Sequence, residues 1–306
     1  MSAEPVLGTM TFGDTVDAGT AGRMLDFALD AGVSGVDTAN GYAGGAAEEI
    51  LGELLRGRRD RVVLATKAGI PHPDAGGHAP LSPAGLRASL EGSLRRLKVD
   101  HVDLFYLHQP DRATPLEDTL ATVAELMDEG KVGSLGVSNF AAWQIAAIDP
   151  PPAVAQQLYN LLARRIEDEY AEFALAGGLR TMVYNPLGGG LLTGRHRFDQ
   201  APESGRFGDS RLAEMYRKRY WDADLFKAVE ALDAIALRAG LPLAELSLRW
   251  LAGKPVVNAV LLGASRVGHL RANLAALAAG PLPSDVADAC DTVGDTLRGP
   301  MPAYNR

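Results

Sequence analysis

Short apolar runs alternate with longer amphipathic stretches along the chain, and this alternation predicts strand–helix units that build a parallel sheet. Eight of the runs have the length and composition of buried strands. They are Val6 to Phe12, Gly35 to Ala39, Val62 to Lys67, Val102 to His108, Val132 to Ser138, Ala153 to Tyr159, Thr181 to Pro186 and Ala259 to Ala264. Eight such units predict a (β/α)8 TIM barrel, a single α/β domain over residues 1–306.

Helices are predicted between these runs. Segments Gly45 to Arg56, Pro83 to Lys98 and Leu116 to Glu129 carry apolar residues at helical spacing. Ser82 before Pro83 is typical of a helix start, with a capping side chain and a proline in the first turn. No G-x-G-x-x-G motif follows the first run, so a doubly wound dinucleotide-binding sheet is disfavoured.

One connection is longer than the others. From about Gly188 to Asp222, after the seventh run, the chain is rich in glycine, arginine and aromatic residues. Loops of this length are usually functional or disordered, and the aromatic content argues against simple disorder, so we predict a cover over a ligand. The stretch after Ala279 predicts an added helix and an extended tail, because it contains Pro281, Pro283, Pro300 and Pro302.

Composition narrows the class of protein. Lys and Arg total 30 against 38 Asp and Glu, a formal net charge of -8, which disfavours binding to nucleic acid or anionic lipid. The first residues show no signal peptide and no segment approaches a membrane span, so we expect a soluble cytoplasmic protein with small-molecule partners. Cys290, the only cysteine, excludes an internal disulfide, and we expect it buried in a late helix; no metal site is predicted.

Asp37, Tyr42, Lys67 and His108 each stand near the end of an early predicted strand. The carboxyl ends of barrel strands share one face, so these side chains can converge there. A phenol with a pKa of about 10 is a weak acid at neutral pH, but a buried ammonium beside it would lower that pKa. We therefore predict that Tyr42 protonates a substrate oxygen, Lys67 assists it, Asp37 balances Lys67, and His108 orients the substrate carbonyl.

Each of these residues has a simpler interpretation when it is taken alone. Asp37 can cap a turn, Tyr42 can pack on the barrel rim, Lys67 can be solvated, and His108 can be a satisfied core histidine. Their joint placement at successive strand ends favours the catalytic interpretation.

Several segments give the chain a resemblance to a known family. They are Asp37 to Tyr42, Thr66 to Lys67, Tyr106 to His108, Gly130 to Phe140 and Gln156 to Asn160. Through them the chain resembles the aldo-keto reductases nearly end to end, and the resemblance implies that the four residues form a catalytic tetrad with Tyr42 as the acid. Tyr184 to Gly194 and Ala213 to Trp221 are most similar to the aflatoxin-aldehyde and succinic-semialdehyde reductase branch.

Carbonyl reduction also needs a hydride, which no ordinary side chain donates, so a bound nicotinamide is expected. The resemblance implies that Ser138, Asn139 and Gln156 hydrogen-bond its carboxamide while the ring of Tyr184 stacks on it. A strand-ending turn is the alternative interpretation of Ser138 and Asn139.

The rest of the cofactor is expected over the seventh and eighth strands. The segment Asn185 to Arg195 would pass over the pyrophosphate, although a solvated loop remains an alternative for Arg195. Its proposed contacts are Asn185, Leu187, Gly189, Gly190 and Arg195. The adenosine phosphate is assigned by resemblance to Gly263, Ser265, Arg266, His269 and Asn273, which favours NADPH over NADH. His269 stands where relatives are expected to carry Gln or Arg, and a neutral imidazole would bind a 2′-phosphate less well.

Three arginines suggest that the substrate carries a carboxylate. Arg206 and Arg219 in the long connection, with Arg306 in the tail, could bind a carboxylate bidentately, although structural salt bridges are the alternative. The leading hypothesis is an NADPH-dependent reductase of aldehydes or ketones, with aromatic or carboxylate-bearing aldehydes as candidates and a possible homodimer. A regulatory nicotinamide-binding module that resembles potassium-channel β subunits is the alternative. A cofactor-free barrel hydrolase or lyase that uses Asp37 and His108 is a third hypothesis.

Overall fold

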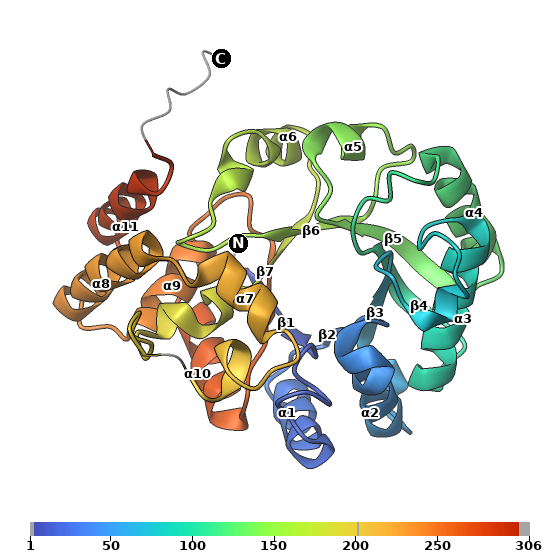
Figure 1. Cartoon of the computed structure of the whole chain (residues 1–306), viewed down its shortest axis with the longest axis horizontal. Coiled ribbons are helices and arrows are strands. Elements are labelled where there is room, and N and C mark those ends of the chain that lie inside the picture. Colours follow the sequence, from blue (N-terminus) through green and yellow to red (C-terminus); the bar gives the residue numbers. More distant parts are fainter. Residues whose placement is uncertain (1–2, 201, 300–306) are drawn as a thin grey trace.

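The computed structural model describes residues 3–200 and 202–299, and these form a closed barrel of parallel strands surrounded by helices (Figure 1). The strands follow one another around the barrel in chain order, and β1 closes it by pairing with β8. They are β1 Glu4–Gly8, β2 Gly35–Asp37, β3 Val63–Ala68, β4 Val102–Leu107, β5 Val132–Ser138, β6 Val154–Leu158, β7 Thr181–Tyr184 and β8 Ala259–Leu262. The predicted (β/α)8 barrel is confirmed.

The helices lie outside the strands (Figure 1). They are α1 Ala18–Asp30, α2 Ala46–Leu54, α3 Pro83–Leu97, α4 Leu116–Asp128, α5 Ala142–Ala146, α6 Tyr170–Ala176, α7 Ala213–Tyr220, α8 Ala223–Arg238, α9 Leu243–Ala252, α10 Val267–Ala278 and α11 Ser284–Thr296. The three segments predicted as helices are α2, α3 and α4. The cap is also confirmed, because Ser82 Oγ accepts a hydrogen bond from the backbone N–H of Gly85 at 3.3 Å.

Most of the predicted strands extend past the observed carboxyl ends, and the first and seventh show why. The first run extends to Phe12, but β1 ends at Gly8, and Phe12 lies in the following loop with its ring fully buried. The apolar pattern thus continues past the strand because the loop itself contributes to the core. The seventh run extends to Pro186, but β7 ends at Tyr184 because Asn185, with φ of 60°, turns the chain.

The barrel interior holds a small core that is distinct from the larger one between strands and helices. Its buried members are Val6, Ala65, Tyr106, Val154, Met182 and Ala259. The ring of Tyr106 fits because β5 has a glycine beside it: a Cβ atom on Gly136 would lie 2.6 Å from Cδ1 of Tyr106. Side chains fill the barrel, so its strand ends are left as the face on which a site can form.

The long connection after β7 contains two 3₁₀ turns, Gly188–Thr193 and Gly205–Phe207, followed by α7. It lies next to β7 and β1 in Figure 1. Ser210 Oγ donates a hydrogen bond to Asp14 Oδ2 at 2.6 Å, and Arg211 Nη1 donates to the carbonyl oxygen of Ala43 at 3.2 Å. These contacts tie the connection to the loops that follow β1 and β2, across the strand ends.

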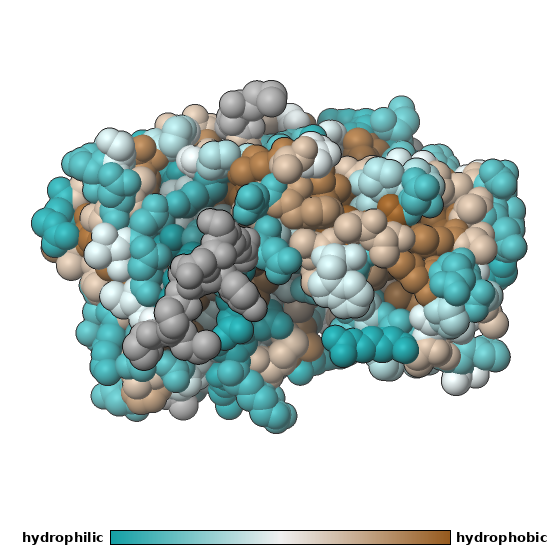
Figure 2. All heavy atoms as spheres, turned by 90° about the horizontal axis from the view of Figure 1, so that it is seen from above, coloured by the Kyte–Doolittle hydropathy of each residue, from teal (hydrophilic) through white to brown (hydrophobic). Residues whose placement is uncertain are grey.

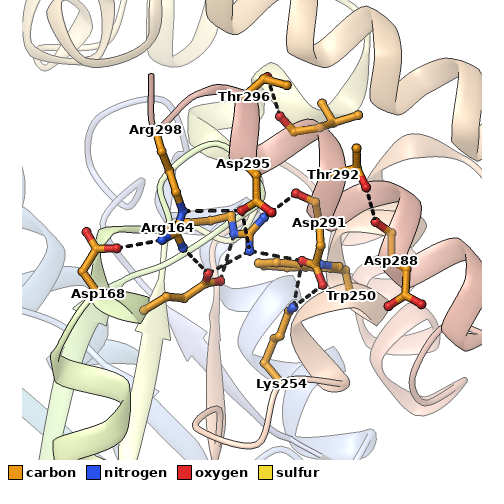
Figure 3. Close-up of polar contacts among 12 residues, drawn as sticks. Arg164, Asp168, Trp250, Lys254, Asp288, Asp291, Thr292, Asp295, Thr296 and Arg298 are labelled. Atoms are coloured by element: carbon orange, nitrogen blue, oxygen red, sulfur yellow. Dashed lines mark hydrogen bonds and ion pairs between the residues drawn. The ribbon is translucent and has the colours of Figure 1, made fainter. Parts of the chain in front are cut away.

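Helix α11 is held to the barrel by an ionic network (Figure 3). Arg164, which follows β6, donates to the carbonyl oxygen of Asp291 at 2.9 Å and forms a bidentate pair with Glu167. Lys254, just after α9, contacts the Asp291 carboxylate at 2.8 Å, and Trp250 Nε1 donates to the same group at 2.9 Å. The added helix is therefore confirmed, with Cys290 buried in it; the predicted tail lies outside the described residues.

The surface in Figure 2 is the side of the barrel that carries α5 and α6, and its hydrophobic areas are interrupted by hydrophilic side chains. Trp143 of α5 and Leu175 of α6 are exposed. Exposed apolar side chains are common on protein surfaces and imply no partner by themselves. Within residues 3–200 and 202–299, no helix combines the length and the apolar character needed to cross a membrane.

The docking of α11 gives a stability prediction. A Cβ atom on Gly294 would overlap Nη1 of Arg164, so Gly294→Ala should lower the free energy of unfolding by about 1–3 kcal/mol. Gly268→Ala in α10 is the control, because the position that its methyl group would take is open space, and it should leave stability unchanged or raise it by up to about 1 kcal/mol. Denaturant unfolding followed by circular dichroism measures both, and equal stability of the two variants would contradict the packing described here.

Candidate active site

Asp37 and Lys67 form an ion pair that is completely buried at the ends of β2 and β3. Two charges can be buried only where further hydrogen bonds satisfy them. Lys67 Nζ also donates to the carbonyl oxygen of Thr38 at 2.8 Å and to the phenol oxygen of Tyr42 at 3.3 Å. Gln156 Nε2 of β6 donates to the second carboxylate oxygen of Asp37 at 2.9 Å. The pair is therefore fully engaged by its neighbours.

The sequence suggested that Tyr42 stands at the end of a strand. In the structure it begins the 3₁₀ turn Tyr42–Gly45 after β2. The turn has positive φ at Ala43, Gly44 and Gly45, with 99° at Gly45. The tight turn brings the Tyr42 ring back to the strand ends, where Lys67 Nζ lies 5.0 Å from the ring centroid.

The pKa of Tyr42 is raised well above its ordinary value, chiefly by burial and then by the negative charge of Asp37; the charge of Arg206 acts in the opposite direction. The net shift is therefore opposite to the lowered pKa that the sequence analysis expected, because burial and the charge of Asp37 outweigh the opposing charge. Burial disfavours the charged form of Lys67 as well, and this lowers the pKa of the lysine; the charge of Asp37 opposes that shift. The phenol keeps its proton at neutral pH, which is the form that a proton donor needs.

His108 follows β4 and meets Tyr42 edge to face, with ring centroids 6.0 Å apart and an interplanar angle of 82°. Burial and the charge of Lys67 lower the pKa of His108 to about 3, so the imidazole is neutral at neutral pH. Its Nδ1 atom is buried and has no hydrogen-bond partner among the described residues. A neutral imidazole can still donate one N–H to a carbonyl oxygen. All four predicted tetrad residues thus converge.

The residues predicted to bind the carboxamide also come together, at the ends of β5, β6 and β7. Asn139 Nδ2 donates to the carbonyl oxygen of His108 at 3.0 Å and to Ser138 Oγ at 3.1 Å, while Asn139 Oδ1 accepts from the hydroxyl of Tyr184 at 2.7 Å. Ser138 accepts in this network, so its own O–H remains available. Gln156 Oε1 accepts no hydrogen bond from the part of the chain described here. One donor and one acceptor are what a primary carboxamide requires.

The polar atoms of Asn185 hold the glycine-rich turn together. Its Oδ1 accepts from the backbone N–H of Gly189 at 2.7 Å, and its Nδ2 donates to the hydroxyl of Tyr220 at 2.8 Å. Gly189 has φ of 70°, and a Cβ atom there would lie 2.6 Å from the ring of Tyr216, so only glycine fits. Gly190 has φ of 105°, and Leu187 packs against the core.

A group of cations lies where the phosphate of the adenosine was expected. Arg266 Nε donates to His269 Nε2 at 2.8 Å, and Ser265 Oγ lies 3.1 Å from His269 Nδ1. Burial lowers the pKa of His269, and the charges of Arg266 and of Arg195, which belongs to the glycine-rich segment, lower it further. Among the described residues neither arginine pairs with a carboxylate. The donor set therefore suits an anion.

The remaining residues predicted near the phosphate, Gly263 and Asn273, lie in the same loop and helix as Ser265, Arg266 and His269. Gly263 directly follows β8 and is exposed. Asn273 is buried on α10, one turn after His269 and therefore on the same side of the helix.

Arg206 and Arg219 flank Tyr216 in the long connection, with their guanidinium carbons 5.1 and 5.9 Å from its ring centroid. Nη1 of Arg206 is buried without a hydrogen-bond partner in the described ranges. The charge of Arg206 lowers the pKa of Tyr42, against the larger effect of burial. Burial raises the pKa of Tyr184 to about 12, and the positive charge of the exposed Arg219 opposes that shift. Arg306 lies outside the described residues.

Sequence alone did not single out Tyr216, although it is buried beside the tetrad and contributes to the raised pKa of Tyr42. Its spacing of four residues from Tyr220, with which it stacks at 6.4 Å, places both rings on one face of α7. That spacing was the signal in the sequence that α7 turns an aromatic face toward the protein.

The low pKa of His108 gives a pH prediction. Its folded-state pKa lies below the ordinary value, so the imidazole should stay neutral as the pH falls from about 8 to about 5. Long-range proton–nitrogen NMR spectra of the folded protein report the protonation state of each histidine. A titration of His108 near its ordinary pKa of about 6.5 would contradict the burial described here.

The sequence matches the model of the aldo/keto reductase family over residues 6–295. The human aldo-keto reductase family 7 member A3 is 38% identical, with 98% of this chain and 96% of the relative aligned. Human aflatoxin B1 aldehyde reductase member 2 is also 38% identical, over 98% of this chain and 89% of that protein. A probable voltage-gated potassium channel subunit beta of Oryza sativa subsp. japonica is 34% identical, over 89% and 86%. The chain therefore belongs to the aldo/keto reductase family, whose members are oxidoreductases that use nicotinamide cofactors.

Proposed function

We propose that this protein is an NADPH-dependent aldehyde reductase in which Tyr42 is the proton donor. The observation that carries the proposal is the convergence of Asp37, Tyr42, Lys67 and His108 at the strand ends, with Lys67 Nζ 3.3 Å from the phenol oxygen. This proton-donating group adjoins the residues proposed to bind the carboxamide, because Gln156 donates a hydrogen bond to Asp37.

A reduced nicotinamide, when bound, would supply the hydride for the carbonyl carbon and be oxidised in doing so. Tyr42 gives its phenolic proton to the carbonyl oxygen, which completes the alcohol, and solvent reprotonates the tyrosinate that is left. His108, being neutral, donates an N–H to the same oxygen and fixes its direction. Lys67 stabilises the tyrosinate as it forms, because its ammonium group already lies in contact with the phenol oxygen.

The residues present fit the cofactor. The hydroxyl of Ser138 and the amide oxygen of Gln156 would bind the carboxamide, with the ring of Tyr184 against the pyridine. Gly189 and Gly190 allow the backbone to approach the pyrophosphate closely. Two arginines without carboxylate partners among the described residues, Arg195 and Arg266, favour the additional phosphate of NADPH over the hydroxyl of NADH. His269 accepts a hydrogen bond from Arg266 and, being neutral, adds no charge.

The proposed substrates are aldehydes that carry a carboxylate. Arg206 supports this choice, because its guanidinium lies near Tyr42 with one nitrogen buried and unpaired among the described residues. An anionic group on the substrate would satisfy it. Two human relatives are named as aflatoxin B1 aldehyde reductases, which agrees with aldehyde reduction.

A regulatory nicotinamide-binding module is the second candidate, since the rice relative is named as a probable potassium channel subunit beta. It would bind NADPH tightly and turn over very slowly. A cofactor-free hydrolase or lyase would not bind NADPH at all. Tryptophan fluorescence on addition of NADPH, followed by steady-state rates, separates all three functions.

Replacing Tyr42 by phenylalanine tests the proton donor. With 2-carboxybenzaldehyde or succinic semialdehyde as substrate, Tyr42→Phe should lower kcat for NADPH oxidation by about 10²–10⁴-fold, because the acid is lost. The Kd for NADPH, measured by fluorescence quenching, should change by less than about threefold, since the ring is retained. A kcat equal to that of the wild-type protein in this variant would exclude the mechanism.

The cofactor choice is tested separately, by comparing the rate of the wild-type protein with NADH and its rate with NADPH.

Replacing Arg206 by glutamine tests the substrate class. Loss of a charge-assisted hydrogen bond costs about 1.5–3 kcal/mol, so kcat/KM for 2-carboxybenzaldehyde should fall by about 10–100-fold. The control is 2-nitrobenzaldehyde, whose nitro group has the planar shape of the carboxylate without a net charge, and its kcat/KM should change little. Equal losses for both aldehydes would show that Arg206 does not read a carboxylate.

A further inference from the structure

Glu48 is a fully buried carboxylate that the proposed mechanism does not use. It lies in the first turn of α2, six residues after Tyr42, and its side chain has no exposed surface. Glutamate is almost never fully buried unless its charge is paired, so its partners indicate why it is there.

The two oxygens of Glu48 connect two different elements. Oε1 accepts a hydrogen bond from Thr66 Oγ1 of β3 at 2.5 Å, and Oε2 accepts from Arg96 Nε of α3 at 2.8 Å. Thr66 directly precedes Lys67 in β3. Glu48 therefore ties the helix that follows the Tyr42 turn to the strand that carries Lys67.

Arg96 supports the same turn from the other side. A Cβ atom on Gly45, the last residue of the turn, would lie 3.0 Å from both Cδ and Nε of Arg96, so the arginine packs directly against it. The rest of its guanidinium binds Asp74 at 3.1 and 2.6 Å. Arg96 thereby compensates the charge of Glu48 and holds it in one orientation.

The charge of Glu48 also reaches Lys67. Burial lowers the pKa of Lys67, while the negative charges of Asp37 and Glu48 both oppose that shift. Glu49, the next residue in the same turn of α2, is exposed.

From this geometry we infer that Glu48 is a positioning residue for the proposed reaction: it holds the Tyr42 turn against β3, the strand that carries Lys67. The inference rests on the proposed function, because it assigns a task only if Tyr42 and Lys67 act together. A merely structural role would make Glu48 variants less stable without changing how the rate depends on pH.

The first test is Glu48→Gln. An amide of the same shape can accept from Arg96 through its oxygen and donate to Thr66 through its nitrogen, so mainly the charge is lost. Because that charge raises the pKa of Lys67, its removal lets Lys67 lose its proton at lower pH. The alkaline limb of the kcat profile should move down by about one pH unit, with the Kd for NADPH within about twofold of wild type. Glu49→Gln, the same charge change at an exposed neighbour, should leave the limb in place.

The second test is Thr66→Val, which removes one hydrogen bond of Glu48 and keeps its charge. It should lower kcat by about tenfold or more through misplacement of the Tyr42 turn, with the alkaline limb at its wild-type position. This variant also tests the positioning role if Glu48→Gln does not yield folded protein.

Three outcomes would overturn the inference. They are a wild-type pH profile in Glu48→Gln, an equal shift in Glu49→Gln, and a wild-type kcat in Thr66→Val. A wild-type protein that fails to reduce any aldehyde with NADPH would instead refute the proposed function, and the inference would fall with it.

Discussion

The buried ion pair between Lys67 and Asp37 is the interaction on which the rest of the candidate site depends. Removing two charges from water costs several kcal/mol per ion, and mutual attraction offsets this only when hydrogen bonds satisfy both groups. Here the carbonyl of Thr38, the phenol of Tyr42 and the amide of Gln156 supply those bonds. The pair thus sets where the ends of β2, β3 and β6 must lie, and it brings a phenol and an amide to the barrel mouth.

Around this pair the proposed function divides the barrel into two halves. The residues proposed to move the proton come from β2, β3 and β4, and those proposed to bind the cofactor come from β5 to β8. They meet where Gln156, which is proposed to bind the carboxamide, donates a hydrogen bond to Asp37. The long connection crosses both halves, from the end of β7 to the loops after β1 and β2, and it brings Arg206 and Tyr216 beside Tyr42.

The alternation of apolar runs was enough to predict the barrel, and the order of strand ends was enough to predict which four residues would converge. Strand limits were missed at Phe12 because a buried loop residue looks the same in sequence as a strand residue. The direction of the Tyr42 pKa could not be predicted either, since it depends on burial and on the distance to Asp37.

The role of Glu48 was also beyond the sequence. Two adjacent glutamates in one helix turn do not reveal which one faces the core. Only the packing against Thr66 and Arg96 separates Glu48 from Glu49. Asn185 shows the same limit, because a residue expected to contact the cofactor uses its side chain to hold the glycine-rich turn.

The most direct measurement of the central claim is single-turnover hydride transfer in Lys67→Met, with NADPH deuterated at the hydride position and the alcohol analysed by mass spectrometry. If the buried pair sustains proton donation by Tyr42, deuterium transfer should fall by at least about a thousandfold while NADPH still quenches tryptophan fluorescence. Transfer within about tenfold of the wild-type rate would contradict the claim that the site depends on the Lys67–Asp37 pair.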